Sequence, residues 1–295
     1  MIQVGRMEKG DVDAAAEILF DAFGAVYRQR GHVPPFPTRD SAAWLCRAYL
    51  DLDPEGCAIA WVGSEAAGVG FAHPRGAVTS IGPLASRPGA PAGVARALMA
   101  ELGRTAARST SLRLFQDSFN PDSFGLYARL GYAVADVAPY LLTEKLIPPG
   151  AVNPSVRAMR PEDMAAVEHY DRARTIADRR RDLALLASTG TALVAAGAAG
   201  AETIRGYLFY RPLPARVVIG PGVAESAETM ADLVDGVAAT LPGRPAVIRA
   251  SAAASSVLLR AFARGFRVDH LGNLMVAGPY TPPPAQLYAL FPESL

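Results

Sequence analysis

A glycine- and alanine-rich stretch, Arg87-Pro-Gly-Ala-Pro-Ala-Gly-Val-Ala-Arg96, leads directly into a segment with a regular apolar spacing. Val94, Leu98 and Leu102 lie four residues apart, which predicts a helix over about 92–107. Small residues at a helix start let main-chain N–H groups approach an anion, and the helix dipole favours negative charge there. The pattern therefore indicates a phosphate site, although an ordinary surface loop can have the same composition.

An internal repeat places this loop within a larger unit. Ile-Gly-Pro turns occur at 81–83 and at 219–221, which are 138 residues apart, and Gly-aromatic pairs occur at 131–132 and 265–266, which are 134 apart. The second copy is therefore four residues shorter between these two landmarks, in the interval that holds the glycine-rich loop. We interpret the chain as a duplicated α/β unit in which one copy kept a phosphate-binding loop.

The elements of the first copy follow from the apolar periodicity and the turn residues. We predict strands near 2–6, 57–62, 67–74, 77–83, 110–117 and 132–145, and helices near 11–24, 41–51, 92–107 and 121–130. The strands between 57 and 83 are joined by short turns and should be antiparallel, whereas a helical crossover should make strand 110–117 parallel to strand 77–83. The turn-rich segment 147–154 is the predicted linker between domains at 1–146 and 155–295.

Composition excludes several classes of protein. A chain of 295 residues is long enough for about two domains, and its net charge of +1 gives no reason to expect a nucleic-acid or membrane partner. Cys46 and Cys57 have no metal-ligand spacing and the four histidines are dispersed, so no metal site is expected. No signal peptide or long apolar run is seen, so a cytoplasmic location is the default expectation.

Three motifs of the first half, in order, resemble those of the Gcn5-related N-acetyltransferase (GNAT) superfamily. Ile81-Gly82-Pro83 stands for the family's Val-x-Pro strand end, and Gly93-Val-Ala-Arg-Ala-Leu-Met99 stands for its glycine loop and helix. Asn120 to Tyr132 follows the family pattern of an Asn, a Leu-Tyr pair and a closing Gly-aromatic. The second half is similar in overall pattern only. The resemblance implies an α/β fold of two tandem GNAT-like domains, each a mostly antiparallel sheet with a central parallel pair flanked by helices.

The resemblance also implies acetyl-CoA, or another acyl-CoA, as a co-substrate, without a metal. Its amide groups would pair with the main chain of Thr79, Ser80 and Ile81, between the splayed strands 77–83 and 110–117. Its pyrophosphate would lie at the start of helix 92–107. The remaining expected contacts are Arg87, Gly89, Ala92, Gly93, Val94, Ala95, Arg96, Asn120 and Tyr127.

Three residues are candidates for the chemistry. The resemblance implies that the Tyr127 phenol, with a pKa of about 10, donates to the departing thiolate, although its ring could simply pack in the core. His73, at the end of a strand, is a candidate general base with a pKa of about 6.5, and Asp117 is a candidate for orienting the amine; both could instead be structural. In the second copy Asn120 corresponds to Ala254 and Tyr127 to Ala261. We therefore predict one working site, in the first half, and a degenerate second half.

The predicted function is an acyl-CoA-dependent N-acyltransferase, with acetyl as the expected group, acting by direct attack of an amine in a ternary complex. A non-catalytic acyl-CoA sensor and an enzyme using a carrier-protein-bound donor are the alternatives. The acceptor is expected to be a small-molecule or peptide amine, and whether the chain forms a homodimer stays open. The resemblance implies that residues 28–36, with the helix of Trp44 and Tyr49, lie near the acceptor pocket, although they could instead form a surface connection without ligand contact. The run 179–182 is interpreted as a solvated helix face, and 287–291 as a docking segment.

Overall fold

The computed structural model describes residues 1–197 and 203–288. All ten elements predicted for the first half are present. The strands are β1 (Ile2–Arg6), β2 (Cys57–Val62), β3 (Glu65–Arg75), β4 (Val78–Ser86), β5 (Ser111–Asp117) and β6 (Ala133–Thr143). The helices are α1 (Val12–Gln29), α2 (Arg39–Leu52), α3 (Val94–Thr105) and α4 (Pro121–Arg129). As predicted, β2, β3 and β4 are antiparallel, and β5 runs parallel to β4.

The second half repeats this order. Its strands are β7 (Val156–Ala158), β8 (Thr191–Ala196), β9 (Ile204–Pro212), β10 (Val217–Ala224), β11 (Ala246–Arg249) and β12 (Arg267–Ala277). Its helices are α5 (Met164–Thr175), α6 (Arg180–Thr189), α7 (Ala227–Thr240) and α8 (Ser255–Ala263). The pair β10 and β11 is parallel, like β4 and β5. A further short strand, β13 (Ala285–Leu287), pairs with β10.

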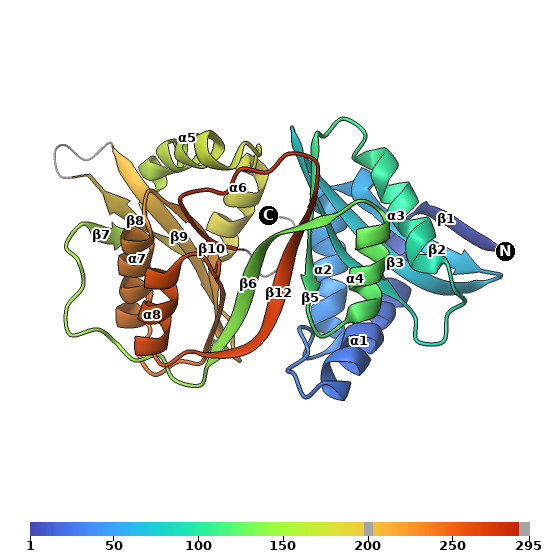
Figure 1. The fold of residues 1–295 in the computed structure, drawn as a ribbon, viewed down its shortest axis with the longest axis horizontal. Helices are drawn as coiled ribbons and strands as arrows, with labels where there is room; N and C mark the ends of the chain where they lie inside the picture. The colour runs from blue at the N-terminus through green and yellow to red at the C-terminus, as the bar shows by residue number, and fades with distance from the viewer. Residues whose placement is uncertain (198–202, 289–295) are drawn as a thin grey trace.

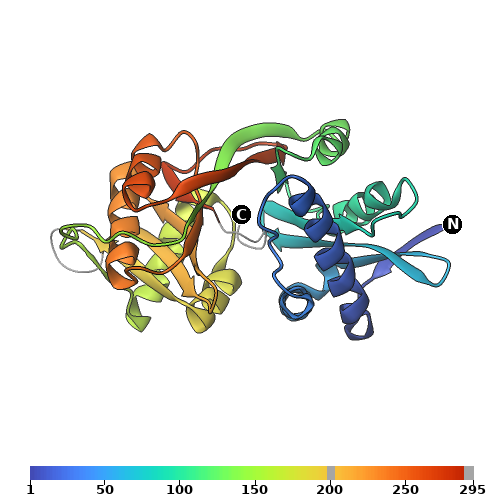
Figure 2. The same cartoon turned by 90° about the horizontal axis from the view of Figure 1, so that it is seen from below.

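The two halves exchange their last long strands. The described strands form one sheet in the order β1-β2-β3-β4-β5-β12-β6-β11-β10-β9-β8-β7, so β12 lies between β5 and β6. Strand β6 of the first half in turn pairs with β11 of the second. Figure 1 shows β6 and β12 side by side between the halves, and Figure 2 shows them arching together from one half to the other. The predicted mixed α/β class is confirmed, but the two expected sheets are continuous.

Helices cover both faces of the first half's strands because the side chains of β2 alternate. Cys57 and Ile59 face the core under α1 and α2, whereas Ala58 and Ala60 face the core under α3 and α4. The second half is built the same way, with α7 and α8 over one apolar cluster and α5 and α6 over the other. Both central parallel pairs are therefore buried between helix layers, which suits a rigid site at their diverging ends.

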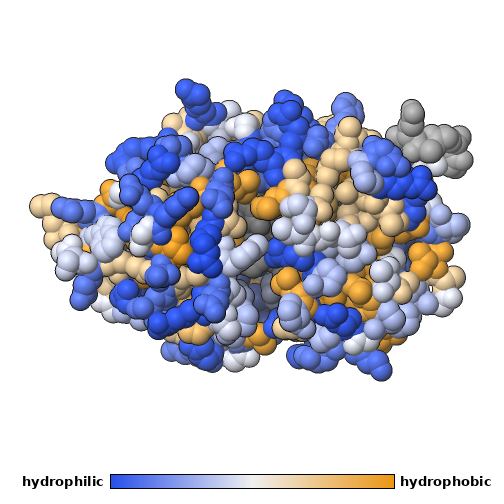
Figure 3. Space-filling model, turned by 180° about the vertical axis from the view of Figure 1, so that it is seen from behind, coloured by the Kyte–Doolittle hydropathy of each residue, from blue (hydrophilic) through white to orange (hydrophobic). Residues whose placement is uncertain are grey.

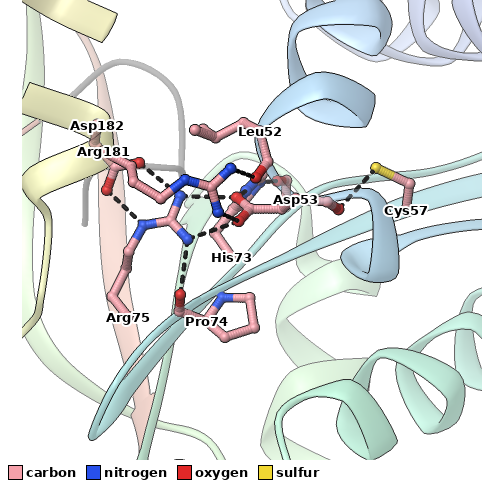
Figure 4. Close-up of polar contacts among 9 residues, drawn as sticks. Leu52, Asp53, Cys57, His73, Pro74, Arg75, Arg181 and Asp182 are labelled. Carbon is pink, nitrogen blue, oxygen red and sulfur yellow. Dashed lines mark hydrogen bonds and ion pairs between the residues drawn. The ribbon is translucent and has the colours of Figure 1, made fainter. Parts of the chain in front are cut away.

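A buried polar network joins the halves. The guanidinium of Arg75, at the end of β3, donates to Asp53 (2.7 and 2.9 Å) and to Asp182 of α6 (2.6 Å twice). Figure 4 shows Arg75 between the two carboxylates. The interpretation of 179–182 as a solvated helix face is wrong for its two ends, because Asp182 and Arg179 are both buried. Arg179 pairs with Asp171, so these charges hold the fold together.

The outer surface carries polar side chains over both halves. Figure 3 shows hydrophilic residues spread across the back of the molecule, with smaller apolar patches between them. Within residues 1–197 and 203–288, no helix is both long and apolar enough to cross a membrane.

Candidate active site

A cleft opens where β4 and β5 separate. The two strands pair only over Val78–Ser80 and Ser111–Arg113. Beyond this ladder lies a cavity of about 140 Å³, lined by residues 81–84 of β4 and 115–117 of β5. A register shift in β4 accompanies the separation, and Gly82 has a φ of 134°, which strongly favours glycine. The main chain of β4 beyond Ser80 therefore faces an open slot instead of a neighbouring strand.

Helix α4 closes one side of this cleft. Asn120 caps the helix by accepting a hydrogen bond from the Ser123 amide (3.3 Å), and both residues line the cavity together with Tyr127. The Tyr127 side chain is only 7% exposed, and burial raises its pKa. The phenol is therefore neutral at physiological pH and can act as a hydrogen-bond donor inside the cleft. Its ring also packs edge-on against Tyr132, with centroids 6.1 Å apart.

Helix α1 and the loop after it form the opposite wall. Phe23 and Tyr27 of α1 and Pro35 and Phe36 of the loop line the cavity. The predicted stretch 28–36 thus contributes its last two residues. Of the two aromatic residues predicted from the next helix, neither lines this cavity: Trp44 is 43% exposed, and Tyr49 packs on His73 instead.

Asp117 is the first of a row of polar side chains that reaches into the second half. Tyr27 Oη donates to its Oδ2 (2.6 Å), and His270 Nε2 lies 3.3 Å from its Oδ1. Although burial acts to raise the pKa of Asp117, the hydrogen bond from His270, the charge of Arg249 and the Tyr27 hydroxyl together lower it. Asp117 is therefore a carboxylate at neutral pH, and it can accept a hydrogen bond in the cleft.

The row continues beyond His270 to a second carboxylate. His270 Nδ1 lies 2.8 Å and His32 Nδ1 lies 3.2 Å from the same oxygen of Asp269. One ligand atom from each of these three residues lies within 4.8 Å of the others, so the set also has the spacing of a cation site. The Nδ1 atoms of His270 and His32 both lie against the Asp269 carboxylate, so we describe the three residues as a polar cluster organised by that carboxylate. Histidines that are dispersed in the sequence are here brought together.

Arg249, the last residue of β11, also lines the cleft. Its side chain is 7% exposed, and its guanidinium carbon lies 4.2 Å from the Phe115 ring centroid and 5.5 Å from that of Tyr140. Its Nε is buried without a hydrogen-bond partner. Sequence reasoning missed Arg249 and His270 because both come from the half predicted to be degenerate.

The start of α3 has no capping side chain. Gly93, in the N-cap position, has a φ of 101° and provides no side-chain cap, whereas the starts of α2 and α7 are capped by Thr38 and Ser226. The next residues, Val94 to Arg96, therefore present first-turn amides without a capping side chain. The loop before α3 is shorter than predicted, because β4 extends to Ser86 and does not end near residue 83. Ile81-Gly82-Pro83 lies inside the strand, and the loop spans only 87–93.

The predicted contact residues lie in different surroundings. The Thr79 and Ser80 main chains are paired with β3 on one side and β5 on the other, so the open slot begins at Ile81. Arg87 is held by Glu17 of α1 (2.8 Å) and by the Ala66 carbonyl (2.9 Å). In the loop, Gly89 has a φ of 83°, and Ala92 is exposed, as is Gly93; Val94 turns its side chain into the core and Ala95 is half-buried.

His73 is not where the sequence predicted a general base. It has no exposed surface and does not line the cleft. Its Nδ1 lies 2.8 Å from Asp53 Oδ2, and its Nε2 lies 3.2 Å from the Gly82 carbonyl oxygen. Although burial acts to raise it, hydrogen bonds from His73 and Arg75 lower the pKa of Asp53 to about 2. Figure 4 shows His73 within this inter-half network, which assigns it a structural part.

The equivalent slot in the second half is filled by the chain itself. Strands β10 and β11 pair over Val217–Ile219 and Ala246–Ile248, and then separate. In the gap, β13 pairs with β10 at Gly222–Ala224, and the Tyr288 amide donates to the Arg249 carbonyl (2.9 Å). The predicted docking of 287–291 is thus seen for 287 and 288, while 289–291 lie outside the described residues. Helix α8 begins after Ala254, as α4 begins after Asn120, so the repeat alignment holds.

The fold is shared with solved structures at low sequence identity. No family model and no curated protein matches the sequence. A candidate acetyltransferase from Pyrococcus horikoshii is 17% identical with a TM-score of 0.77, over 99% of this chain and 95% of that one. A GCN5-related N-acetyltransferase from Sphaerobacter thermophilus is 15% identical, with a TM-score of 0.65, over 95% and 97%.

A third structure has the same tandem arrangement. The tandem GNAT protein from the clavulanic acid biosynthesis pathway is 13% identical with a TM-score of 0.62, over 95% of this chain and all (100%) of that one. These likenesses extend along nearly the whole chain, so they cover both halves. The sequence-based recognition of a tandem GNAT protein is thereby confirmed at the level of the fold. The chain has the tandem fold of the Gcn5-related N-acetyltransferases.

Proposed function

We propose that this chain is an acyl-CoA-dependent N-acyltransferase that moves an acetyl group from acetyl-CoA to an amine. The observation that carries the proposal is the contrast between two equivalent slots. The slot between β4 and β5 is an open cavity lined by Tyr127, Asn120 and Asp117, whereas the slot between β10 and β11 is occupied by β13. One working site per chain, in the first half, follows from this contrast.

The residues around the open slot suit a nucleotide-tailed thioester. Extended backbone at Ile81 to Leu84 offers main-chain groups to the amides of a pantetheine arm. The uncapped start of α3 offers amides and a positive dipole end to a pyrophosphate. Bound acyl-CoA supplies a thioester carbonyl that is activated toward amines.

The chemistry then needs a proton acceptor and a proton donor on this chain. A C–N bond forms as the amine attacks, the C–S bond breaks, and the amine loses a proton. Asp117 accepts that proton or orients the amine. His270 lies between Asp117 and Asp269, and Asp269 also contacts the half-buried His32. The neutral Tyr127 phenol donates to the developing thiolate. Holding the two reactants together supplies much of the remaining rate.

The second half is part of this site. Arg249 and His270 both come from the second half; Arg249 lines the cleft, and β12, which carries His270, pairs with β5 over Leu112 to Asp117. A fragment of residues 1–146 would therefore lack the strand that supports Asp117. This dependence gives the degenerate half a role beyond stabilising its partner.

The direct test is thiol release from acetyl-CoA with a panel of amines, together with calorimetric titration of CoA. We expect one CoA per chain and free thiol only when an accepted amine is present. CoA binding without thiol release from any amine would instead identify a sensor. Release only from an acyl group on a phosphopantetheinyl carrier protein would identify a carrier-dependent enzyme. No affinity for CoA, free or acylated, would contradict the proposal.

A further inference from the structure

Arg249 is a buried cation without a carboxylate partner among the residues that the structure describes. No ion pair or hydrogen bond joins its guanidinium to any residue within 1–197 and 203–288, and its Nε is buried and unpaired. Burying an arginine in this way is costly unless a counter-charge is present for part of the working cycle. Since the side chain lines the cleft, the ligand of the cleft is the natural source of that charge.

The nearest carboxylate in the cleft is already committed. Asp117 accepts a hydrogen bond from Tyr27 and lies 3.3 Å from His270, and it makes no ion pair with Arg249. The charge of Arg249 nevertheless helps to keep Asp117 ionised. The same small cavity is therefore lined by one fixed anion and one fixed cation that do not neutralise each other by contact.

The aromatic rings around Arg249 hold its planar guanidinium group in place. Its guanidinium lies over Phe115 and near Tyr140, which orders a planar cation while leaving its N–H edge free to donate. A carboxylate matches two parallel N–H donors of arginine better than a single-point anion does. Phe23, Pro35 and Phe36 add an apolar wall that a hydrophobic side chain of the acceptor can contact.

We infer that the acceptor is an amine that carries a carboxylate, as in an α-amino acid, and that Arg249 binds this carboxylate while Asp117 receives the amine. This inference rests on the proposed acyl transfer and deepens it by naming the acceptor class. It also gives a role to an arginine of the second half that lines the cleft of the first half.

The test compares amino acids with matched amines that lack the negative charge. Thiol release from acetyl-CoA is measured with the twenty L-amino acids, their carboxamides, their decarboxylated amines and the corresponding aminophosphonates. The carboxylates should be preferred over the carboxamides by about 10- to 100-fold in kcat/KM. Arg249→Met should abolish that preference by raising KM for the amino acid more than KM for its carboxamide, so that the ratio of the two kcat/KM values falls to about one.

Matched variants separate binding from folding. Arg249→Lys keeps the positive charge but loses the two parallel N–H donors of the guanidinium, and it should retain part of the preference for amino acids over carboxamides. Arg113→Met removes another buried arginine, which packs on Tyr280 and does not line the cleft, and should leave the preference intact. Three results would overturn the inference. They are an equal kcat/KM of the wild type for amino acids and carboxamides, binding of acetyl-CoA without turnover of any of the amino acids, and a preference for the aminophosphonates. Failure to bind acetyl-CoA at all would instead remove the proposed function.

Discussion

The guanidinium carbon of Arg249 lies 4.2 Å from the ring centroid of Phe115, although the two residues occupy equivalent positions in the two halves. They are 134 residues apart, the offset that also relates the Gly-aromatic pairs. Each lies just beyond the paired part of a parallel ladder: Arg249 follows Ile248, the last β11 residue paired with β10, and Phe115 lies two residues beyond Arg113, the last β5 residue paired with β4. A duplicated position has thus become an aromatic platform in one half and a cation in the other, and both serve one cleft.

Tyr127→Phe tests the proton donor. The variant keeps the ring, which packs against Tyr132, and loses only the hydroxyl. We expect turnover to fall by about 100-fold, because one positioned acid is lost, while CoA affinity stays within about twofold. Thiol release and calorimetry measure the two quantities. Tyr132→Phe removes a neighbouring hydroxyl that does not line the cleft and should leave both unchanged. Unchanged turnover in Tyr127→Phe would take this tyrosine out of the mechanism.

Asp117→Asn tests the proton acceptor. Because the pKa of Asp117 lies below its ordinary value of 3.8, the carboxylate is ionised throughout pH 5–9. The ratio of wild-type to variant kcat/KM should therefore be about 100 and nearly constant across this range. Asp122→Asn, at an exposed position in the first turn of α4, is the control and should keep wild-type activity. A ratio near one would show that another group receives the proton.

Leu287→Ala tests the docked tail. Leu287 has no exposed surface, belongs to the large core of the second half and pairs with Gly222 in the slot between β10 and β11. Its truncation should lower the free energy of unfolding by about 2–5 kcal/mol, measured by chemical denaturation. Leu259→Ala, on the exposed face of α8, should change it by less than about 0.5 kcal/mol. Equal effects of the two substitutions would mean that the tail does not fill the slot.

Asp53→Asn tests the network between the halves through its pH dependence. The pKa of Asp53 is about 2 in the folded chain and 3.8 when unperturbed, so between these values the unfolded chain binds more protons. Asp53 therefore contributes stability above pH 4 that is lost as the pH falls toward 2, by about 2 kcal/mol. The variant should be less stable at pH 7 and should lose less on acidification.

The control for this experiment is Asp51→Asn, at an exposed position two residues away. It should follow the wild-type curve in chemical denaturation between pH 2 and pH 7. An Asp53→Asn curve parallel to the wild type would show that His73 and Arg75 do not lower the pKa of Asp53 in solution.

Local elements of this fold could be predicted because their signals are local. The stripe Val94, Leu98 and Leu102 depends only on helix periodicity, and the parallel direction of β5 follows from the helix before it. The equivalence of Ala254 with Asn120 came from counting residues between repeated turns. None of these inferences depends on whether a strand pairs within its own half or with the other half.

The pairing between the halves could not be predicted in the same way. The alternation of β6 and β12 suits the edge of either half, so the sequence pattern does not distinguish an exchange from two separate sheets. Asp117 and His270 are 153 residues apart and meet only because of that exchange. His73 was placed correctly at the end of a strand, but its burial depends on Asp53 and Arg75, which the fold brings together.

A crystal structure of the full chain with acetyl-CoA tests the central claim most directly. The account predicts one molecule per chain, with its pantetheine arm between β4 and β5, its pyrophosphate at the start of α3, and β13 still in place between β10 and β11. Density for the molecule in the second half, with β13 displaced, or an empty cleft beside Tyr127 at saturating ligand, would contradict it.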